Sequence, residues 1–156
     1  MLLRKLDPTF YAENAHLKEV LDNHNGNWEA GKTRGYGIAV ITLEKNLKFA
    51  IPLRSNIKHS GSYITVKHNS HGSHGKGLDF SKALLIEQSN YVSSEIFKIP
   101  SKEFKILRSK SRFIIVTFEK YVDRYVEAVK SKDRNILSSD EYRFCTLINY
   151  HTQLGL

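Results

Sequence analysis

The feature that most constrains the fold of this chain is a change in the spacing of its apolar residues after residue 100. Segments 36–43, 47–53 and 62–68 are short and either β-branched or alternating, and the apolar run at 82–87 is equally short. Such segments are typical of strands, and the turn-like residues between the first two predict a hairpin. From 112 to 130, apolar residues instead recur on one face of a long helix. This order predicts an α+β fold.

Two further helices and two loops are expected around these segments. We expect an amphipathic helix at 10–23 and a final helix after Ser138, which has capping-box spacing to Glu141. Segment 23–35 is rich in Asn and Gly and contains the only tryptophan, so it is expected to be an exposed loop. Segment 69–77 has no apolar side chain to bury and is expected to be a mobile loop.

The length of the chain, 156 residues and 18.0 kDa, is that of one ordinary domain. Because no linker or repeat divides it, we expect a single domain over residues 1–156. No apolar run approaches the roughly 20 residues that a membrane-spanning helix needs. The start lacks the pattern of a secretory signal, and the single Cys145 cannot close an internal disulfide. We therefore expect a soluble, cytoplasmic protein without a membrane partner.

The charge of the chain indicates a polyanionic partner. Lys and Arg total 24 against 16 Asp and Glu, a formal net charge of +8. Such a surplus raises the local concentration of nucleic acid or anionic lipid. Charge alone does not distinguish an enzyme from a passive binder.

The densest group of reactive side chains follows the second predicted strand. It comprises Arg54, Ser55, Lys58 and His59. A hydroxyl beside two cations and an imidazole can hold a phosphate, stabilise a pentacoordinate phosphorane and move protons, as metal-free RNA cleavage requires. The alternative is a solvated loop, because these residue types are also common in turns.

Two other groups have the composition of an RNA-binding surface. The first comprises Lys32, Thr33, Arg34 and Tyr36, in which cations precede an aromatic residue that can stack on an unpaired base. The alternative is that Tyr36 belongs to the core. The second is a basic strip, Lys102, Lys105, Arg108, Lys110 and Arg112, followed by Phe113. Its alternative is an ordinary solvated face.

The histidine series His68, His71 and His74 invites a metal interpretation, because imidazole binds zinc, copper and nickel. No cysteine lies nearby, and the surrounding Gly and Ser residues provide no preorganisation. We therefore expect no metal site and no cofactor. Cys145 lies on the apolar face of the predicted final helix and is expected to be a buried, inert thiol.

Three separated motifs, in order, carry a resemblance to a known family. They are the segment Tyr36-Gly37-Ile38, the segment 49–55 (FAIPLRS) with Lys58-His59 after it, and the segment 77–86 (GLDFSKALLI). Over residues 30–130 the chain resembles the ToxN/AbiQ family of type III toxin–antitoxin endoribonucleases, and most of all its TenpN branch.

This resemblance implies a fold and an activity. The fold is a partly open, SH3-like antiparallel β-barrel related to the Kid/MazF toxins and decorated by helices. The activity is sequence-selective, metal-independent cleavage of target RNA, part of phage defence by abortive infection. The partner is an antitoxin RNA of repeated pseudoknots, with which such toxins form RNA-bridged homo-oligomeric complexes.

The resemblance also implies roles for particular residues. Ser55 matches the second hydroxyl residue of the family segment P-L-[ST]-S-P-K, while Arg54 stands where the family has Thr or Ser. Lys58 is one residue further from Ser55 than the family lysine is. Phe113 matches a family aromatic and Lys32 a family lysine, and both are implied to contact RNA.

We therefore expect an endoribonuclease in which the target 2′-hydroxyl attacks its own phosphate, leaving a 2′,3′-cyclic phosphate and a 5′-hydroxyl. Ser55 and Lys58 are expected at the chemistry and Arg54 on the scissile phosphate. His59 is suited either to proton transfer near neutral pH or to structural hydrogen bonding. The rival interpretation is a non-catalytic basic RNA-binding regulator. A DNA-targeting regulator would need a DNA-binding arm that the sequence does not contain.

Overall fold

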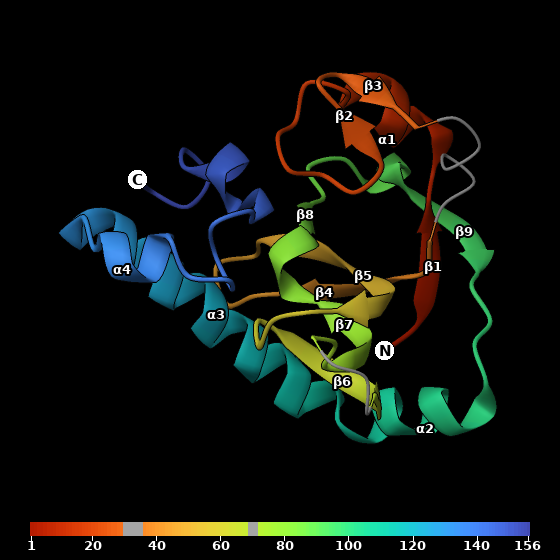
Figure 1. Cartoon of the computed structure of the whole chain (residues 1–156). Coiled ribbons are helices and arrows are strands. Elements are labelled where there is room, and N and C mark those ends of the chain that lie inside the picture. Colours follow the sequence, from red (N-terminus) through yellow and green to blue (C-terminus); the bar gives the residue numbers. More distant parts are fainter. Residues whose placement is uncertain (30–35, 69–71) are drawn as a thin grey trace.

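The computed structural model describes residues 1–29, 36–68 and 72–156 and shows a mixed α+β fold around one antiparallel sheet (Figure 1). The sheet strands are β1 (Leu3–Leu6), β4 (Ile38–Thr42), β5 (Lys48–Ile57), β6 (Ser62–Lys67), β7 (Gly75–Asp79), β8 (Leu84–Leu85) and β9 (Val92–Ile96). They run in the order β6-β7-β5-β4-β1-β9, and β8 pairs with β5. The sheet is not closed: within the described residues, β6 and β9 are its edges.

Helices lie at both ends of this sheet. The α-helices are α1 (Pro8–Glu13), α2 (Ser101–Ser109), α3 (Ser111–Ser131) and α4 (Arg134–Leu137), and the 3₁₀ helices are η1 (Phe80–Lys82), η2 (Ser89–Tyr91) and η3 (Thr146–Tyr150). A separate small hairpin joins β2 (Asn23–His24) to β3 (Asn27–Trp28). Figure 1 shows α1 and this hairpin at one end of the molecule and α2 and α3 at the other.

Alternate residues of the central strands pack into two different apolar clusters, because successive strand side chains point to opposite faces. Phe49 and Ile51 of β5 belong to the cluster that includes the buried face of α3. Ala50, between them, belongs to the cluster that includes Phe10 of α1. The central strands are therefore covered on both faces.

Strand β5 changes partner along its length, and this change creates the site. Its first half pairs with β4 and β8, whereas its second half pairs with β7. The register with β7 shifts between Arg54 and Ile57, as in a β-bulge. The bulged residues, Ser55 and Asn56, are both exposed.

Several predicted elements are confirmed. The hairpin of β4 and β5, strand β6 and the long helix α3 all lie where the apolar spacing places them. Of the predicted strand at 82–87, only Leu84–Leu85 is a strand, because residues 80–82 form η1. Strands β1 and β9 and helix α2 were not predicted.

The prediction of one helix over 10–23 is wrong. Helix α1 begins after Asp7, whose carboxylate accepts the N–H of Thr9, and it ends at Glu13. The side-chain amide of Asn14 donates to the Phe10 carbonyl at this end. Glu19 and Asp22 then adopt positive φ angles of 63° and 61°, which a right-handed helix does not contain.

The predictions of loops at 23–35 and 69–77 are wrong in part. In the first, β2 and β3 form a hairpin, and the Trp28 indole N–H donates to the Tyr11 carbonyl at 2.7 Å; residues 30–35 lie outside the described residues. In the second, β7 already begins at Gly75, while 69–71 lie outside the described residues. A Cβ on Gly77 would overlap the Tyr63 carbonyl oxygen, so glycine here permits close pairing with β6.

The prediction of a capped final helix after Ser138 is also wrong. Ser138 is instead the C-cap of the short helix α4. The Glu141 carboxylate accepts a hydrogen bond from the Ser60 hydroxyl at 2.8 Å and forms an ion pair with Arg124 at 3.3 Å. It therefore contacts the β5–β6 turn and α3 and does not cap a helix. Turns and the 3₁₀ helix η3 follow.

Candidate functional site

The candidate site is built around Asp79, a fully buried carboxylate at the end of β7. Arg54 Nη1 donates to Asp79 Oδ2 at 2.7 Å. The Ser81 hydroxyl and backbone N–H donate to Oδ1 at 2.7 and 3.0 Å, and His59 Nε2 lies 3.2 Å from the same oxygen. The network therefore joins β5, the β5–β6 turn, β7 and η1 through one carboxylate.

The location of Asp79 follows from the local chain path. Because Asp79 has extended backbone angles and its side chain accepts the N–H of Ser81, it caps η1. The pairing of Arg54 with Gly77 across β5 and β7 brings the guanidinium beside this cap. Arg54 of β5 thus forms a hydrogen bond with a residue 25 positions later in the sequence.

The pKa of Asp79 is set by two opposing effects. Burial by itself raises this pKa, but hydrogen bonds from His59, Ser81 and Arg54 outweigh burial and lower it to about 2. The carboxylate is therefore ionised at neutral pH and acts as an acceptor that fixes its three donors.

Both ring nitrogens of His59 are engaged. The backbone N–H of Gly61 donates to Nδ1 at 3.1 Å, so the ring proton of the neutral imidazole is assigned to Nε2, which faces Asp79 and the Ser81 hydroxyl. A Cβ on Gly61 would lie 2.9 Å from the Tyr121 ring, which ties this turn to α3. The geometry corresponds to the structural hydrogen bonding that was one of the two expectations for His59.

The Arg54 guanidinium is hydrogen-bonded to Asp79 on one side and faces a cavity with the rest of its surface. Its side chain remains 34% exposed and lines a polar cavity of about 860 Å³. The rest of the wall is Lys82 and the segment from His16 to Gly26. A fixed cation at the wall of a polar cavity is suited to bind an anion such as a phosphodiester.

Lys82 supplies a second cation to this cavity. Its side chain is only 14% exposed, and Nζ donates to the carbonyls of Glu19 and Phe144 at 2.9 and 2.7 Å. Burial lowers the pKa of this ammonium, an effect that the nearby carboxylates of Glu19 and Asp79 oppose. Lys82 therefore joins the N-terminal and C-terminal segments around the cavity.

Ser55 and Lys58 lie on the same strand end but outside the Asp79 network. Both are exposed. Within the described residues, neither side chain forms a hydrogen bond or an ion pair. The structure thus brings Arg54 and His59 together on Asp79 and leaves Ser55 and Lys58 free to meet a ligand.

The predicted RNA-binding residues are differently placed. Lys32, Thr33 and Arg34 lie outside the described residues. Tyr36 packs against the apolar cluster around Phe10, as its alternative interpretation expected. The Tyr36 hydroxyl is buried without a hydrogen-bond partner among the described residues, and burial raises the pKa of the phenol well above its usual value. Tyr36 is therefore a neutral donor rather than an exposed stacking surface.

Phe113 and Arg112, by contrast, are exposed at the start of α3. The Phe113 ring is 58% exposed and makes an edge-on contact with Tyr63 of β6, with 6.1 Å between ring centroids. Phe113 is thus not a core residue. Its open face is suited to stacking on a base.

The other chemical candidates are accounted for by their surroundings. Cys145 is buried, and burial raises the pKa of its thiol to about 11, which leaves it protonated. His68 Nδ1 lies 3.2 Å from the Ser73 hydroxyl, and the described residues hold no group of three or more potential metal ligands. Among the described helices, none has both the length and the apolar character to cross a membrane.

Sequence reasoning assigned no role to Asp79, Ser81 or Lys82. The available signal was an acidic residue, Asp79, between the apolar residues Leu78 and Phe80, after which Ser81 and Lys82 follow. No protein-family model, curated protein or solved structure matches the chain. What the site can do is therefore inferred from its own residues.

Proposed function

We propose that this protein is a metal-independent endoribonuclease of the ToxN/AbiQ type, acting in the cavity beside Arg54. One observation carries the proposal: the Arg54 guanidinium is fixed by a fully buried carboxylate and faces a polar cavity that also contains Lys82. Two preorganised cations can stabilise the charge that develops on a phosphorane without reorganisation of solvent.

The nucleophile of the reaction is supplied by the substrate itself. The 2′-hydroxyl loses its proton to a base and its oxygen attacks the adjacent phosphorus. The bond from phosphorus to the 5′-oxygen breaks, and that oxygen takes up a proton. The products are a 2′,3′-cyclic phosphate and a 5′-hydroxyl.

Each residue has a proposed part in this reaction. Arg54 binds the scissile phosphate, and Lys82 adds a second positive charge. Ser55 and Lys58 are exposed but do not line this cavity; we propose that they reach the reacting groups of RNA bound there, with Lys58 stabilising the phosphorane or taking part in proton transfer. His59 is a positioning residue, since it acts on Arg54 through Asp79.

The proposal extends to fold and partners. The open antiparallel sheet, in which β5 pairs with different strands at its two ends, is compatible with a partly open SH3-like barrel of the Kid/MazF kind. The net charge of +8 suits both target RNA and a repetitive pseudoknot antitoxin RNA in an RNA-bridged homo-oligomer. Such a toxin acts in the cytoplasm.

One observation favours the rival, a non-catalytic RNA-binding regulator. Both His59 nitrogens are occupied, so the imidazole is not available as a base in this conformation. In that case Arg54, Lys82 and Phe113 bind RNA without cleaving it.

Purified wild-type protein and the Ser55→Ala, Lys58→Ala and Arg54→Gln variants, incubated with a long RNA, distinguish the two. The proposal expects cleavage by the wild type, loss of cleavage in the variants, and retained binding of antitoxin RNA by Ser55→Ala and Lys58→Ala, whose exposed side chains support no core packing. Binding without cleavage by the wild type would favour the regulator.

A further inference from the structure

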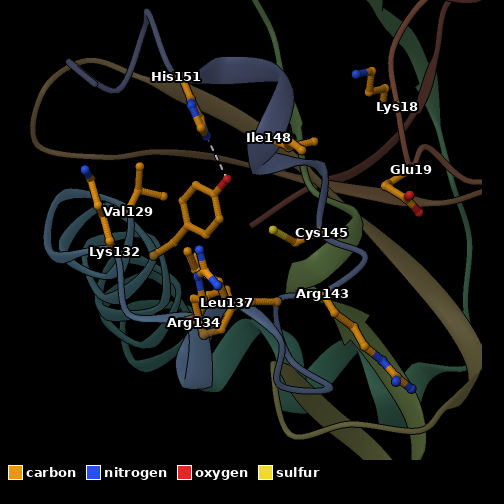
Figure 2. Close-up of a pocket in the computed structure, with 12 residues that line it drawn as sticks. Lys18, Glu19, Val129, Lys132, Arg134, Leu137, Arg143, Cys145, Ile148 and His151 are labelled. Atoms are coloured by element: carbon orange, nitrogen blue, oxygen red, sulfur yellow. Dashed lines mark hydrogen bonds between the residues drawn. The ribbon is translucent and has the colours of Figure 1, made fainter.

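A second cavity, of about 450 Å³, lies between the C-terminal segment and the junction of α3 and α4. Its cationic lining residues are Lys18, Lys132, Arg134 and Arg143. Figure 2 shows Lys132 and Arg134 on the helical side of the cavity and Lys18 and Glu19 on the opposite side. The cavity therefore has positive charge on facing walls.

Most of this charge is not neutralised by the protein itself. Within the described residues, the Lys132, Arg134 and Lys18 side chains form no ion pair and no hydrogen bond. Arg143 pairs with Asp140 at 3.1 Å, and Glu19 is the one carboxylate among the residues lining the cavity. An anionic ligand would thus replace water around cations that have no internal partner.

The second cavity is adjacent to the candidate site. Lys18 and Glu19 line both cavities. Lys82, which faces the first cavity, donates to the Phe144 carbonyl, and the preceding residue, Arg143, lines the second. The segment that contains Lys18 and Glu19 therefore forms a wall of both cavities, and the hydrogen bond of Lys82 connects the first cavity to the C-terminal segment that lines the second.

An exposed aromatic side chain, Phe144, lies in the chain between Arg143 and Cys145 of the second cavity, and its carbonyl accepts a hydrogen bond from Lys82 of the first; its side chain lines neither cavity. The Phe144 ring is 54% exposed, and the Arg143 guanidinium carbon lies 4.9 Å from its centroid. A ring with a cation against one face and solvent on the other can stack a nucleobase on the open face.

The second cavity is lined by side chains that can bind a ligand but are not activated for catalysis. The Tyr125 hydroxyl is engaged with His151 Nε2 at 2.8 Å, and the Cys145 thiol is held protonated by burial (Figure 2). Leu137 and Ile148 add apolar surface. This combination of free cations and apolar walls is typical of a nucleotide-binding subsite.

We propose that the second cavity binds a nucleotide that flanks the cleaved bond, so that one RNA strand occupies both cavities and stacks a base on Phe144 as it crosses. Arg134 and Lys132 contact the flanking phosphate. This inference rests on the proposed function, because it takes single-stranded RNA as the ligand of the first cavity.

The test is a length series of fluorescent 2′-O-methyl oligoribonucleotides, which cannot be cleaved because the 2′-oxygen carries no proton. We compare probes of about 4 and about 10 nucleotides, within the usual range of single-strand site sizes. The proteins are the wild type, Arg134→Gln, Phe144→Ala, and Lys120→Gln. Lys120 is an exposed cation on α3 that lines neither cavity and thus controls for loss of charge.

The wild type and Lys120→Gln are expected to bind the longer probe about tenfold more tightly than the shorter one. Arg134→Gln and Phe144→Ala are expected to lose most of that gain while binding the shorter probe normally. The salt dependence for the longer probe should fall by nearly one counterion in Arg134→Gln only. Melting temperatures confirm that the variants fold.

The outcomes separate this inference from the proposed function. An equal length gain in Arg134→Gln, or no gain in the wild type, would overturn the second-cavity proposal alone, provided that the wild type still binds the shorter probe. A wild type that binds neither probe would contradict the proposed function itself, and the inference with it.

Discussion

At the scale of single residues, the buried carboxylate of Asp79 determines both the geometry and the acid sensitivity of the site. It accepts hydrogen bonds from Arg54, His59 and Ser81, which leaves one edge of the guanidinium fixed and the remainder open to the cavity. Removing one member of a buried ionic network leaves its partners with uncompensated charge. The orientation of Arg54, which we propose binds the substrate phosphate, therefore depends on a carboxylate that is itself fully buried.

The folded-state pKa of Asp79, about 2, lies below its ordinary value of 3.8. Between these values the unfolded chain binds more protons than the folded chain. The network thus contributes stability that is fully present above about pH 4 and is lost as pH falls toward 2, an effect of about 2 kcal/mol. We expect Asp79→Asn to lower the free energy of unfolding by about 3 kcal/mol near neutral pH.

Denaturant unfolding at a series of pH values checks this prediction. The matched control is Asp123→Asn, an exposed carboxylate on α3. Asp79→Asn should also reduce the decline in stability between pH 4 and 2, whereas Asp123→Asn should not. Parallel pH profiles for the wild type and Asp79→Asn would contradict the role given to this carboxylate.

Phe113 provides a second test at this scale. Because its ring is largely exposed, Phe113→Leu should leave the melting temperature nearly unchanged. If the ring stacks on a base, the substitution weakens RNA binding by about 1–3 kcal/mol without altering the salt slope, since stacking releases no counterions. A lower melting temperature with unchanged RNA affinity would remove Phe113 from the RNA-binding surface.

At the scale of elements, the site exists because β5 pairs with β7 beyond the residues that pair with β4. This second pairing brings Arg54 opposite Gly77 and close to Asp79, and the hairpin of β6 and β7 completes the sheet edge. The pairing of β6 and β7 requires a residue without a Cβ at Gly77, where the Tyr63 carbonyl approaches. Gly75 has the same requirement, because a Cβ there would lie 2.1 Å from the Val66 carbonyl oxygen, whereas a Cβ on Gly72 would meet nothing within 4 Å.

We expect Gly77→Ala to destabilise the protein by several kcal/mol or to prevent folding, because the added methyl group would displace the β6 backbone. The control is Gly72→Asn in the preceding turn, where a Cβ meets nothing within 4 Å and asparagine tolerates the positive φ of 80°. Thermal unfolding measures both. A Gly77→Ala variant as stable as Gly72→Asn would show that β6 and β7 do not pair as described.

The same elements show how far the sequence predicts the structure. Helix α3 and the hairpin of β4 and β5 follow from apolar spacing, because each buries a regular face. Strand β7 escapes prediction because glycine residues show no periodicity. The residues from Arg54 to His59 are contiguous, so the sequence alone predicts that they lie together. Asp79 and Lys82 come close to them only because β5 pairs with β7, and composition and spacing do not reveal that pairing.

At the scale of the whole molecule, two adjacent cavities and a net charge of +8 are the features on which the proposal of an extended RNA ligand rests. The N-terminal segment, β5, η1 and the C-terminal segment all contribute to this surface, held together by Lys82. RNA binding should therefore weaken steeply as salt rises, with a slope near the number of phosphates neutralised. A fluorescence titration of wild-type protein against salt checks this, and an affinity independent of salt would contradict it.

The central claim, metal-free RNA cleavage beside Arg54, is tested most directly by mass spectrometry of the RNA ends. Wild-type protein and Arg54→Gln are incubated with RNA in the presence of EDTA. The account predicts that the wild type leaves a 2′,3′-cyclic phosphate on the upstream fragment and a 5′-hydroxyl on the downstream one, while Arg54→Gln leaves the RNA intact. A 5′-phosphate on the downstream fragment, cleavage that requires an added divalent ion, or unchanged cleavage by Arg54→Gln would contradict it.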